Sequence, residues 1–198
     1  MNPILLSAEA LSVQRGDRLL IEGLGFTLSA GEGMHLTGTN GAGKTSLLRV
    51  LAGLGHALEG LVNVRAGARL IYLGHALGLK PELTVTENLR FLLQVTDLKE
   101  KTTVDEALSE VGLARYFDIP VANLSAGQKK RVGLARLLLE PADLWLLDEP
   151  FSALDARSCQ WLCDRIDLFL AEGGAVLLTS HQQVPVRHPL RRLELGAR

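Results

Sequence analysis

Residues that build disulfide frameworks and cofactor-holding clusters are scarce in this sequence. Its 198 residues include only two cysteines, Cys159 and Cys163, which are too few for a disulfide scaffold. Zinc or haem ligation would need more partners than two thiols, and there is no C-x-x-C-H motif for haem attachment. Because the two cysteines are four residues apart in a segment of helical pattern, we predict that both are small, half-buried apolar side chains.

An excess of charge of one sign is also missing. The 21 lysines and arginines nearly balance the 22 aspartates and glutamates, and the longest basic run is Lys129, Lys130, Arg131. A nucleic-acid-binding protein usually carries a basic patch or stripe. The composition therefore argues against nucleic acid as a partner.

Long hydrophobic runs are absent as well. No apolar run approaches the roughly 18 residues of a membrane-spanning helix, and the N-terminus lacks the basic start and apolar stretch of a signal peptide. We therefore expect a cytoplasmic chain. Its length and its hydrophobic content of 47% suffice for one sizeable core, or for a core with a small subdomain.

The hydrophobic pattern alternates between strands and helices. Strands are expected at 4–13 and 19–28, as a hairpin around the Gly16-Asp17 turn, and at 34–37, 61–64, 70–73, 144–147 and 175–179. Helical spacing is found at 44–54, across 79–122, at 125–139 and at 156–171, and the C-terminal tail has only a weak pattern. Wholly apolar strands between helices predict an α/β protein with a mostly parallel sheet covered on both faces.

The first chemical motif is a glycine-rich loop between the strand expected at 34–37 and the next helix. It satisfies the pattern G-x-x-x-x-G-K-[ST] and comprises Gly38, Thr39, Asn40, Gly41, Ala42, Gly43, Lys44 and Thr45, with Ser46 next in the helix. Glycines let the backbone N–H groups face phosphate oxygens, and the helix N-terminus adds partial positive charge. The motif predicts a P-loop that binds ATP, with Lys44 at the β- and γ-phosphates and the Thr45 hydroxyl on Mg²⁺.

A pair of adjacent carboxylates follows the apolar strand expected at 144–147. These are Asp148 and Glu149, and such like charges repel each other unless a cation binds nearby. We predict that Asp148 lies in or near the Mg²⁺ shell and that Glu149 polarises the attacking water as a general base. Taken alone, the pair is equally consistent with a solvated acidic turn.

Three further motifs narrow the class. The first resembles the L-S-G-G-Q signature of ABC ATPases with one glycine replaced, and comprises Leu124, Ser125, Ala126, Gly127 and Gln128. In isolation Ser125 would be read as an ordinary helix N-cap. The segment 152–155, which ends at Asp155, is similar to the D-loop of that family, and His181 is similar to its switch histidine. All five motifs follow the family's order, so the resemblance covers essentially the whole chain.

The resemblance implies a fold and a mechanism. The fold is that of a P-loop NTPase (RecA-like), with an N-terminal antiparallel β subdomain, a core of 1–75 and 123–198, and an inserted helical subdomain at 76–122. Family members pair head to tail as homodimers, so that one ATP lies between the P-loop of one chain and the signature helix of the other. His181 would then contact the γ-phosphate, and Asp155 would connect the two sites. Closure and opening of the dimer would drive separate membrane permease subunits.

The segment 74–89 and the short chain resemble, more narrowly, the ATP-binding subunits of the haem exporter of cytochrome c maturation. That resemblance implies integral membrane partners of the cytochrome c maturation type. It also implies a peripheral position on the cytoplasmic face of the bacterial inner membrane and no direct contact with haem. The alternative is the ATPase of another small bacterial importer or exporter, because the sequence of a motor does not reveal the transported molecule.

Two positions depart from the family. Gln14 and Arg15 stand where an aromatic ring usually stacks on adenine; the Arg15 guanidinium plane could take that role, or remain solvated. Ala76 stands where the Q-loop carries glutamine. Since alanine can neither complete a Mg²⁺ shell nor orient water, this departure predicts a slow or weakly coupled ATPase.

Functions of other classes fit the sequence less well. ABC proteins that act on ribosomes normally carry two ATPase halves in one chain, and those that act on DNA carry a long coiled-coil insertion. Neither arrangement fits 198 residues. A nucleotide-binding regulator without turnover remains open, although Glu149 argues against it.

Overall fold

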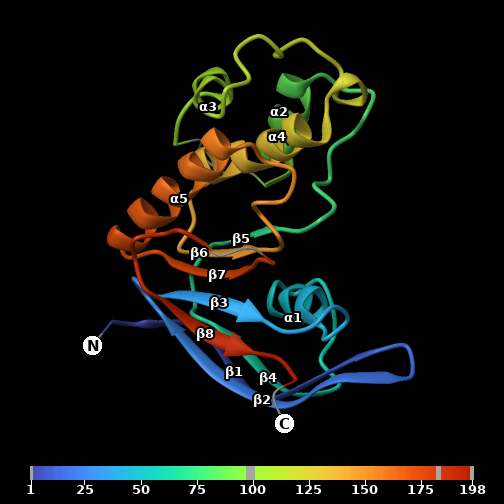
Figure 1. Ribbon diagram of the computed structural model, residues 1–198, viewed down its shortest axis with the longest axis vertical. Coiled ribbons are helices and arrows are strands. Elements are labelled where there is room, and N and C mark those ends of the chain that lie inside the picture. The colour runs from blue at the N-terminus through green and yellow to red at the C-terminus, as the bar shows by residue number, and fades with distance from the viewer. Residues whose placement is uncertain (1, 97–100, 182–183, 197–198) are drawn as a thin grey trace. The chain divides into compact units, whose positions relative to one another are not determined.

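The computed structural model describes residues 2–96, 101–181 and 184–196 (Figure 1). The chain forms two compact units. The first contains Met1–Gly74, Ala142–Pro150 and Cys163–Arg198, and the second contains His75–Pro141 and Phe151–Leu162. The second unit thus extends beyond the helical subdomain expected at 76–122.

The first unit opens with an antiparallel sheet in the order β2-β1-β4. Strands β1 (Ile4–Arg15) and β2 (Arg18–Ser29) form the expected hairpin, and β4 (Glu59–Val64) pairs with the other edge of β1. The turn residue Gly16 has a φ of 59°, a left-handed conformation that glycine adopts without steric cost. The two residues of the turn leave Arg15 directly opposite Arg18.

A five-stranded sheet of order β5-β6-β7-β3-β8 forms the other layer of this unit, and all its strand pairs are parallel. The predicted members are β3 (Gly33–Thr37), β5 (Leu70–Leu73), β6 (Leu144–Leu147) and β7 (Ala175–Thr179). Every residue of β6 and β7 is buried, which explains their unbroken apolar sequence. The prediction of a mostly parallel sheet is confirmed.

The C-terminal tail contains a strand that the sequence pattern did not predict. Strand β8 (Leu190–Glu194) pairs with β3 at the edge of the parallel sheet. Only Leu190 and Leu193 are partly buried, and exposed Arg191 and Arg192 lie between them. The two partly buried leucines are three residues apart, so they lack the two-residue alternation that predicts a strand.

Helix α1 (Lys44–Leu51) is shorter than the expected 44–54. The Gly53 N–H donates to the Val50 carbonyl, and the Leu54 N–H donates to the Arg49 carbonyl, with Gly53 at a φ of 71°. This pair of bonds is a Schellman ending, in which a left-handed glycine closes the last turn. Helix α5 (Ala156–Ala171) begins in the second unit and ends in the first.

The second unit is helical. Helices α2 (Val85–Thr96), α3 (Val104–Glu110) and α4 (Ala126–Leu139) pack on one another, with a 3₁₀ turn at Val121–Asn123. Their shared core is made of the residues that carried the helical spacing, among them Val85, Leu89, Leu108, Val132 and Leu138. Within the block 79–122, the described residues form helices at 85–96 and 104–110 with loops between them, and the part at 97–100 lies outside the described residues. Helix α4 ends at Leu139, with Glu140 as its C-cap before Pro141, as predicted.

The two cysteines lie on α5. Cys159 is half-buried, as predicted, whereas Cys163 is fully buried. Burial raises the pKa of the Cys159 thiol, so this side chain stays uncharged at neutral pH. Among the described residues, no helix has the length and the apolar character that a membrane crossing requires.

Candidate functional site

The P-loop connects β3 to α1 and is shaped by three glycines in the left-handed region. Gly38, Gly41 and Gly43 have φ values of 148°, 81° and 101°. The Lys44 ammonium donates to the carbonyls of Gly38 at 2.8 Å and Thr39 at 3.2 Å, so the lysine holds its own loop in shape. The N-cap of α1 is Gly43, which has no side chain to bond the first N–H groups of the helix. These donors are therefore available to an anion.

The first carboxylate is buried and held by two hydroxyl groups. Asp148 is 2% exposed, its Oδ2 accepts from the Thr45 hydroxyl at 2.7 Å, and its Oδ1 accepts from the Thr179 hydroxyl at 2.9 Å. The parallel register of β5 and β6 adds a bond from the Asp148 N–H to the Leu73 carbonyl at 2.8 Å. Asp148 thus ties the end of β6 to the first turn of α1.

The second carboxylate starts from an unusual backbone conformation. Glu149 has a φ of 48°, which costs a non-glycine residue of order 1 kcal/mol and persists only where its surroundings enforce it. The Glu149 N–H donates to the Thr179 hydroxyl oxygen at 2.8 Å, while that hydroxyl donates to Asp148. One threonine on β7 therefore contacts both residues, through the Asp148 carboxylate and the Glu149 backbone.

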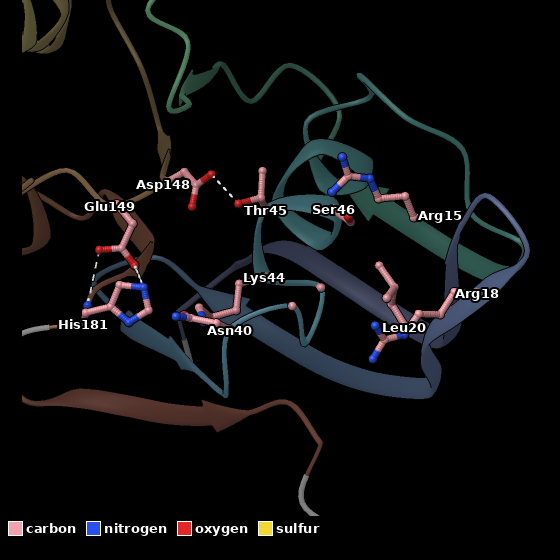
Figure 2. A pocket seen from close by; sticks show the side chains of 12 residues that line it. Arg15, Arg18, Leu20, Asn40, Lys44, Thr45, Ser46, Asp148, Glu149 and His181 are labelled. Atoms are coloured by element: carbon pink, nitrogen blue, oxygen red, sulfur yellow. Dashed lines mark hydrogen bonds and ion pairs between the residues drawn. The ribbon is translucent and has the colours of Figure 1, made fainter.

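Glu149 and His181 lie against each other (Figure 2). The His181 backbone N–H donates to Glu149 Oε2 at 3.3 Å, and His181 Nε2 lies 3.5 Å from Glu149 Oε1. The parallel pairing of β6 with β7 brings the two strand ends together. A carboxylate and an imidazole thus meet where β6 and β7 end.

These residues line a cavity of about 340 Å³. Its walls come from the P-loop, from both strand ends and from the hairpin, and consist of Arg15, Arg18, Leu20, Asn40, Gly41, Gly43, Lys44, Thr45, Ser46, Asp148, Glu149 and His181. The structure therefore brings most of the predicted residues of the P-loop, both carboxylates and the histidine into one place. Gly38, Thr39 and Ala42 shape the loop behind it.

The hairpin contributes two arginines, of which the sequence analysis found only one. Arg15 and Arg18 form a cross-strand pair, and Figure 2 shows Arg15 near Ser46 and Arg18 beside Leu20. Like charges directly opposite each other are unfavourable, so the pair is suited to an anionic ligand. Arg18 could have been inferred, because a two-residue turn places its flanking residues face to face. Gln14 instead donates to the Gly16 carbonyl at 2.6 Å and braces the turn.

The oxygen atoms in the pocket fit a metal that is shared with a nucleotide. Among the described residues, no group of three or more His, Cys, Asp or Glu side chains could hold a metal ion. Thr45 Oγ1 and Asp148 Oδ2, 2.7 Å apart, offer hard oxygen ligands. Mg²⁺ is typically held by one or two such groups and completes its shell with phosphate oxygens and water.

The signature segment begins α4 in the second unit. The Gln128 N–H donates to the Ser125 hydroxyl oxygen at 3.2 Å, and the Ser125 N–H donates to Gln128 Oε1 at 2.8 Å. This reciprocal arrangement is a capping box, so the N-cap interpretation of Ser125 is confirmed. A Cβ on Gly127 would lie 2.6 Å from the Ala153 carbonyl oxygen, whereas Ala126 is exposed. The structure thus accounts for alanine at the first of these positions and glycine at the second.

A hollow of about 210 Å³ joins the signature segment to the D-loop segment within the second unit. Its lining consists of Ser125, Gly127, Gln128, Arg131, Ala153, Leu154, Asp155 and Ser158. Hydrogen bonds from Ser158, through its side chain and its backbone N–H, lower the pKa of Asp155, so this exposed carboxyl is ionised at neutral pH. Arg131, one helical turn after Gly127, was not predicted from the sequence. The Q-loop position, Ala76, is exposed in the loop that follows β5.

The family and the solved structures that this chain resembles are those of ABC transporter proteins. Residues 21–152 match the sequence model of the ABC transporter family. The cytochrome c biogenesis ATP-binding export protein CcmA of Methylococcus capsulatus is 46% identical, over 99% of this chain and all of the relative. A solved ATP-binding subunit of an ABC transporter has a TM-score of 0.81 at 29% identity, over 89% of this chain and 79% of that one. An ATP-binding cassette solved as a dimer with ADP and Pi has a TM-score of 0.79 at 20% identity, over 90% and 88%.

Proposed function

We propose, from the premise that the chain belongs to the ABC transporter family and is a CcmA-like ATP-binding subunit, that its ATP hydrolysis drives membrane subunits of a cytochrome c biogenesis exporter. The observation that supports this most directly is the meeting of Lys44, Asp148, Glu149 and His181 around one cavity. The P-loop by itself would explain the binding of a nucleotide but not its hydrolysis. The added contact between a carboxylate and a histidine supports turnover.

The phosphates of ATP would lie at the start of α1. Backbone N–H groups of the P-loop and the helix N-terminus face them, and the Lys44 ammonium would exchange its loop carbonyls for β- and γ-phosphate oxygens. Arg15 and Arg18 would contact the remainder of the nucleotide, with a guanidinium plane against the adenine in place of the family's aromatic ring. When bound with ATP, Mg²⁺ neutralises charge on the phosphate oxygens, and Thr45 and Asp148 would hold it.

Glu149 is the proposed general base. Its carboxylate would accept a proton from the water that attacks the γ-phosphorus, as the bond to the leaving ADP oxygen breaks. His181, held beside Glu149, would contact the γ-phosphate and make this geometry depend on its presence. The hydroxyl groups of Thr45 and Thr179 keep Asp148 in place throughout.

The signature hollow has a role only if a second protomer is present. In a head-to-tail homodimer, Ser125, Ala126, Gly127 and Gln128 of one chain would face the ATP held by the P-loop of its partner, and Asp155 would connect the two sites. Support comes from the family and from the dimeric state of a structural relative bound to ADP and Pi. Loss of the γ-phosphate would then remove the anion that joins the two protomers.

The membrane partners follow from the relatives. CcmA proteins carry the description of ATP-binding export proteins of cytochrome c biogenesis, which supports permease subunits of that type and a peripheral position on the cytoplasmic face of the bacterial inner membrane. ATP hydrolysis by the chain would drive the exporter, and the chain itself would not contact haem. The ATPase of another small bacterial importer or exporter is the alternative, and permease genes of the cytochrome maturation type beside this one would decide against it.

Replacing the general base tests hydrolysis. Glu149→Gln keeps size and hydrogen bonding but removes the charge that polarises water, so kcat should fall at least about a hundredfold while ATP affinity remains. A dimer should accumulate with ATP on a sizing column. The matched control is Glu172→Gln, an exposed glutamate just after α5, which should retain full activity. Near wild-type hydrolysis by Glu149→Gln would show that Glu149 is not the base.

A further inference from the structure

A histidine outside the pocket lining contacts the backbone just before His181. His35 lies on β3, opposite Leu178 of β7, and its ring is half-buried. His35 Nε2 is 3.2 Å from the carbonyl oxygen of Ser180. Since a carbonyl only accepts, Nε2 must carry the proton in this bond, as it does in one neutral tautomer and in the imidazolium.

The carbonyl that His35 contacts belongs to the peptide group whose N–H is that of His181. On the other side of that planar group, the N–H donates to Glu149 Oε2 at 3.3 Å. In a trans peptide the C=O and N–H point in opposite directions. One peptide plane is therefore held from both sides, by a histidine of β3 and by the carboxylate after β6.

We propose that His35 is a positioning residue for hydrolysis, which acts on Glu149 through the peptide group between Ser180 and His181. The bond to the carbonyl fixes the plane of the peptide and polarises it, so that its N–H becomes a better donor. That N–H orients the Glu149 carboxylate, and the same plane sets the starting direction of the His181 side chain, whose Nε2 lies 3.5 Å from Glu149 Oε1.

This role rests on the proposed function of Glu149 and extends it to a residue of another strand. His35 lies three residues before the P-loop, on the strand that leads into the phosphate site. A single bond thus relates the strand that supports the phosphates to the loop that carries the base and the switch. The inference concerns turnover, because His35 does not line the cavity.

The test compares a variant that removes the donor with one that restores it. His35→Leu should lower kcat roughly three- to tenfold, the rate equivalent of one hydrogen bond, with KM and ATP affinity changed less than about twofold. His35→Gln should recover most of the loss, because its amide N–H can donate to the same carbonyl. The control is His188→Leu, another half-buried histidine outside the pocket lining, which should leave kcat unchanged.

A double variant separates positioning from general packing. If His35 acts through Glu149, then His35→Leu should cost less than about twofold in single-turnover hydrolysis when added to Glu149→Gln. A full additional loss, or a loss that His35→Gln does not reverse, would overturn the proposal while leaving the general base intact. If Glu149→Gln alone hydrolyses normally, the proposed function itself is wrong.

Discussion

The N-termini of α1 and α4 would each contact a phosphate of ATP. They differ in whether a side chain caps them. The start of α1 follows Gly43 and has no side chain over its N–H groups. The start of α4 is closed by the reciprocal bonds of Ser125 and Gln128. One helix therefore presents open donors to an anion, whereas the other already satisfies part of its own.

We infer from this difference that the two helix starts bind phosphate with different strengths. The open start can bind phosphate strongly on its own, with Lys44 beside it. The capped start must give up or share its bonds, so it is suited to a weaker and reversible contact that depends on the γ-phosphate. Glycine also serves different needs, because Gly43 is required by its φ of 101° and Gly127 by the space next to the Ala153 carbonyl oxygen.

The largest effect in the capped region is expected at Gly127. Gly127→Ala would place a Cβ 2.6 Å from the Ala153 carbonyl oxygen, which forces the D-loop segment away at a cost of about 1–3 kcal/mol. Denaturant unfolding should show this loss, and kcat should fall severely.

The exposed neighbour provides the control for this substitution. Ala126→Gly restores the family motif at a solvent-facing position, so both its stability and its turnover should stay close to wild type. Equal effects of the two changes would mean that space at Gly127 is not what distinguishes these positions.

A smaller effect is expected for the cap itself, and α3 offers a matched comparison. Thr103 and Glu106 form the same capping box at the start of α3, far from any assigned chemistry in the sequence. Ser125→Ala and Thr103→Ala should each cost about 1 kcal/mol in the free energy of unfolding. Only Ser125→Ala should also lower kcat, by about tenfold. If both variants hydrolyse ATP alike, Ser125 is a cap and nothing more.

This comparison should be made near neutral pH. Hydrogen bonds led by that from the Thr102 hydroxyl, then from the backbone and side chain of Thr103, lower the pKa of Glu106 from 4.5 to about 2. A depressed carboxyl pKa stabilises the folded state above the unfolded value and loses that contribution as pH falls from about 4.5 towards 2. Acid would therefore weaken the α3 box selectively.

The sequence alone predicted the parts of the site that have a fixed spacing or an extreme composition. The P-loop, the carboxylates after an apolar strand and the signature segment all depend on neighbours in the chain, and so do the hairpin and the buried strands. Strand β8 was not predicted because its few apolar residues do not show the two-residue period of a strand. Arg18 was not predicted as a pocket residue because it comes next to Arg15 only through the cross-strand pairing at the turn.

Contacts between segments far apart in the chain could not be predicted from the sequence. Nothing in the spacing of His35 and Ser180, 145 residues apart, indicates that a side chain of β3 contacts the peptide before His181. The same holds for the Ala153 carbonyl, which decides why glycine is needed at 127. Such contacts depend on strand order and loop conformation, and these are set by the packing of the whole unit.

Mixed dimers test most directly the central claim, that one ATP joins the open start of α1 in one protomer to the capped start of α4 in its partner. One form carries Lys44→Ala in one protomer and Ser125→Glu in the other, and the second form carries both changes in a single protomer beside an intact one. Head-to-tail pairing leaves one intact site in the first form and none in the second, so only the first should hydrolyse ATP at about half the wild-type rate. Activity in the second form and none in the first would contradict the account, because it would place both helix starts of a site in the same chain.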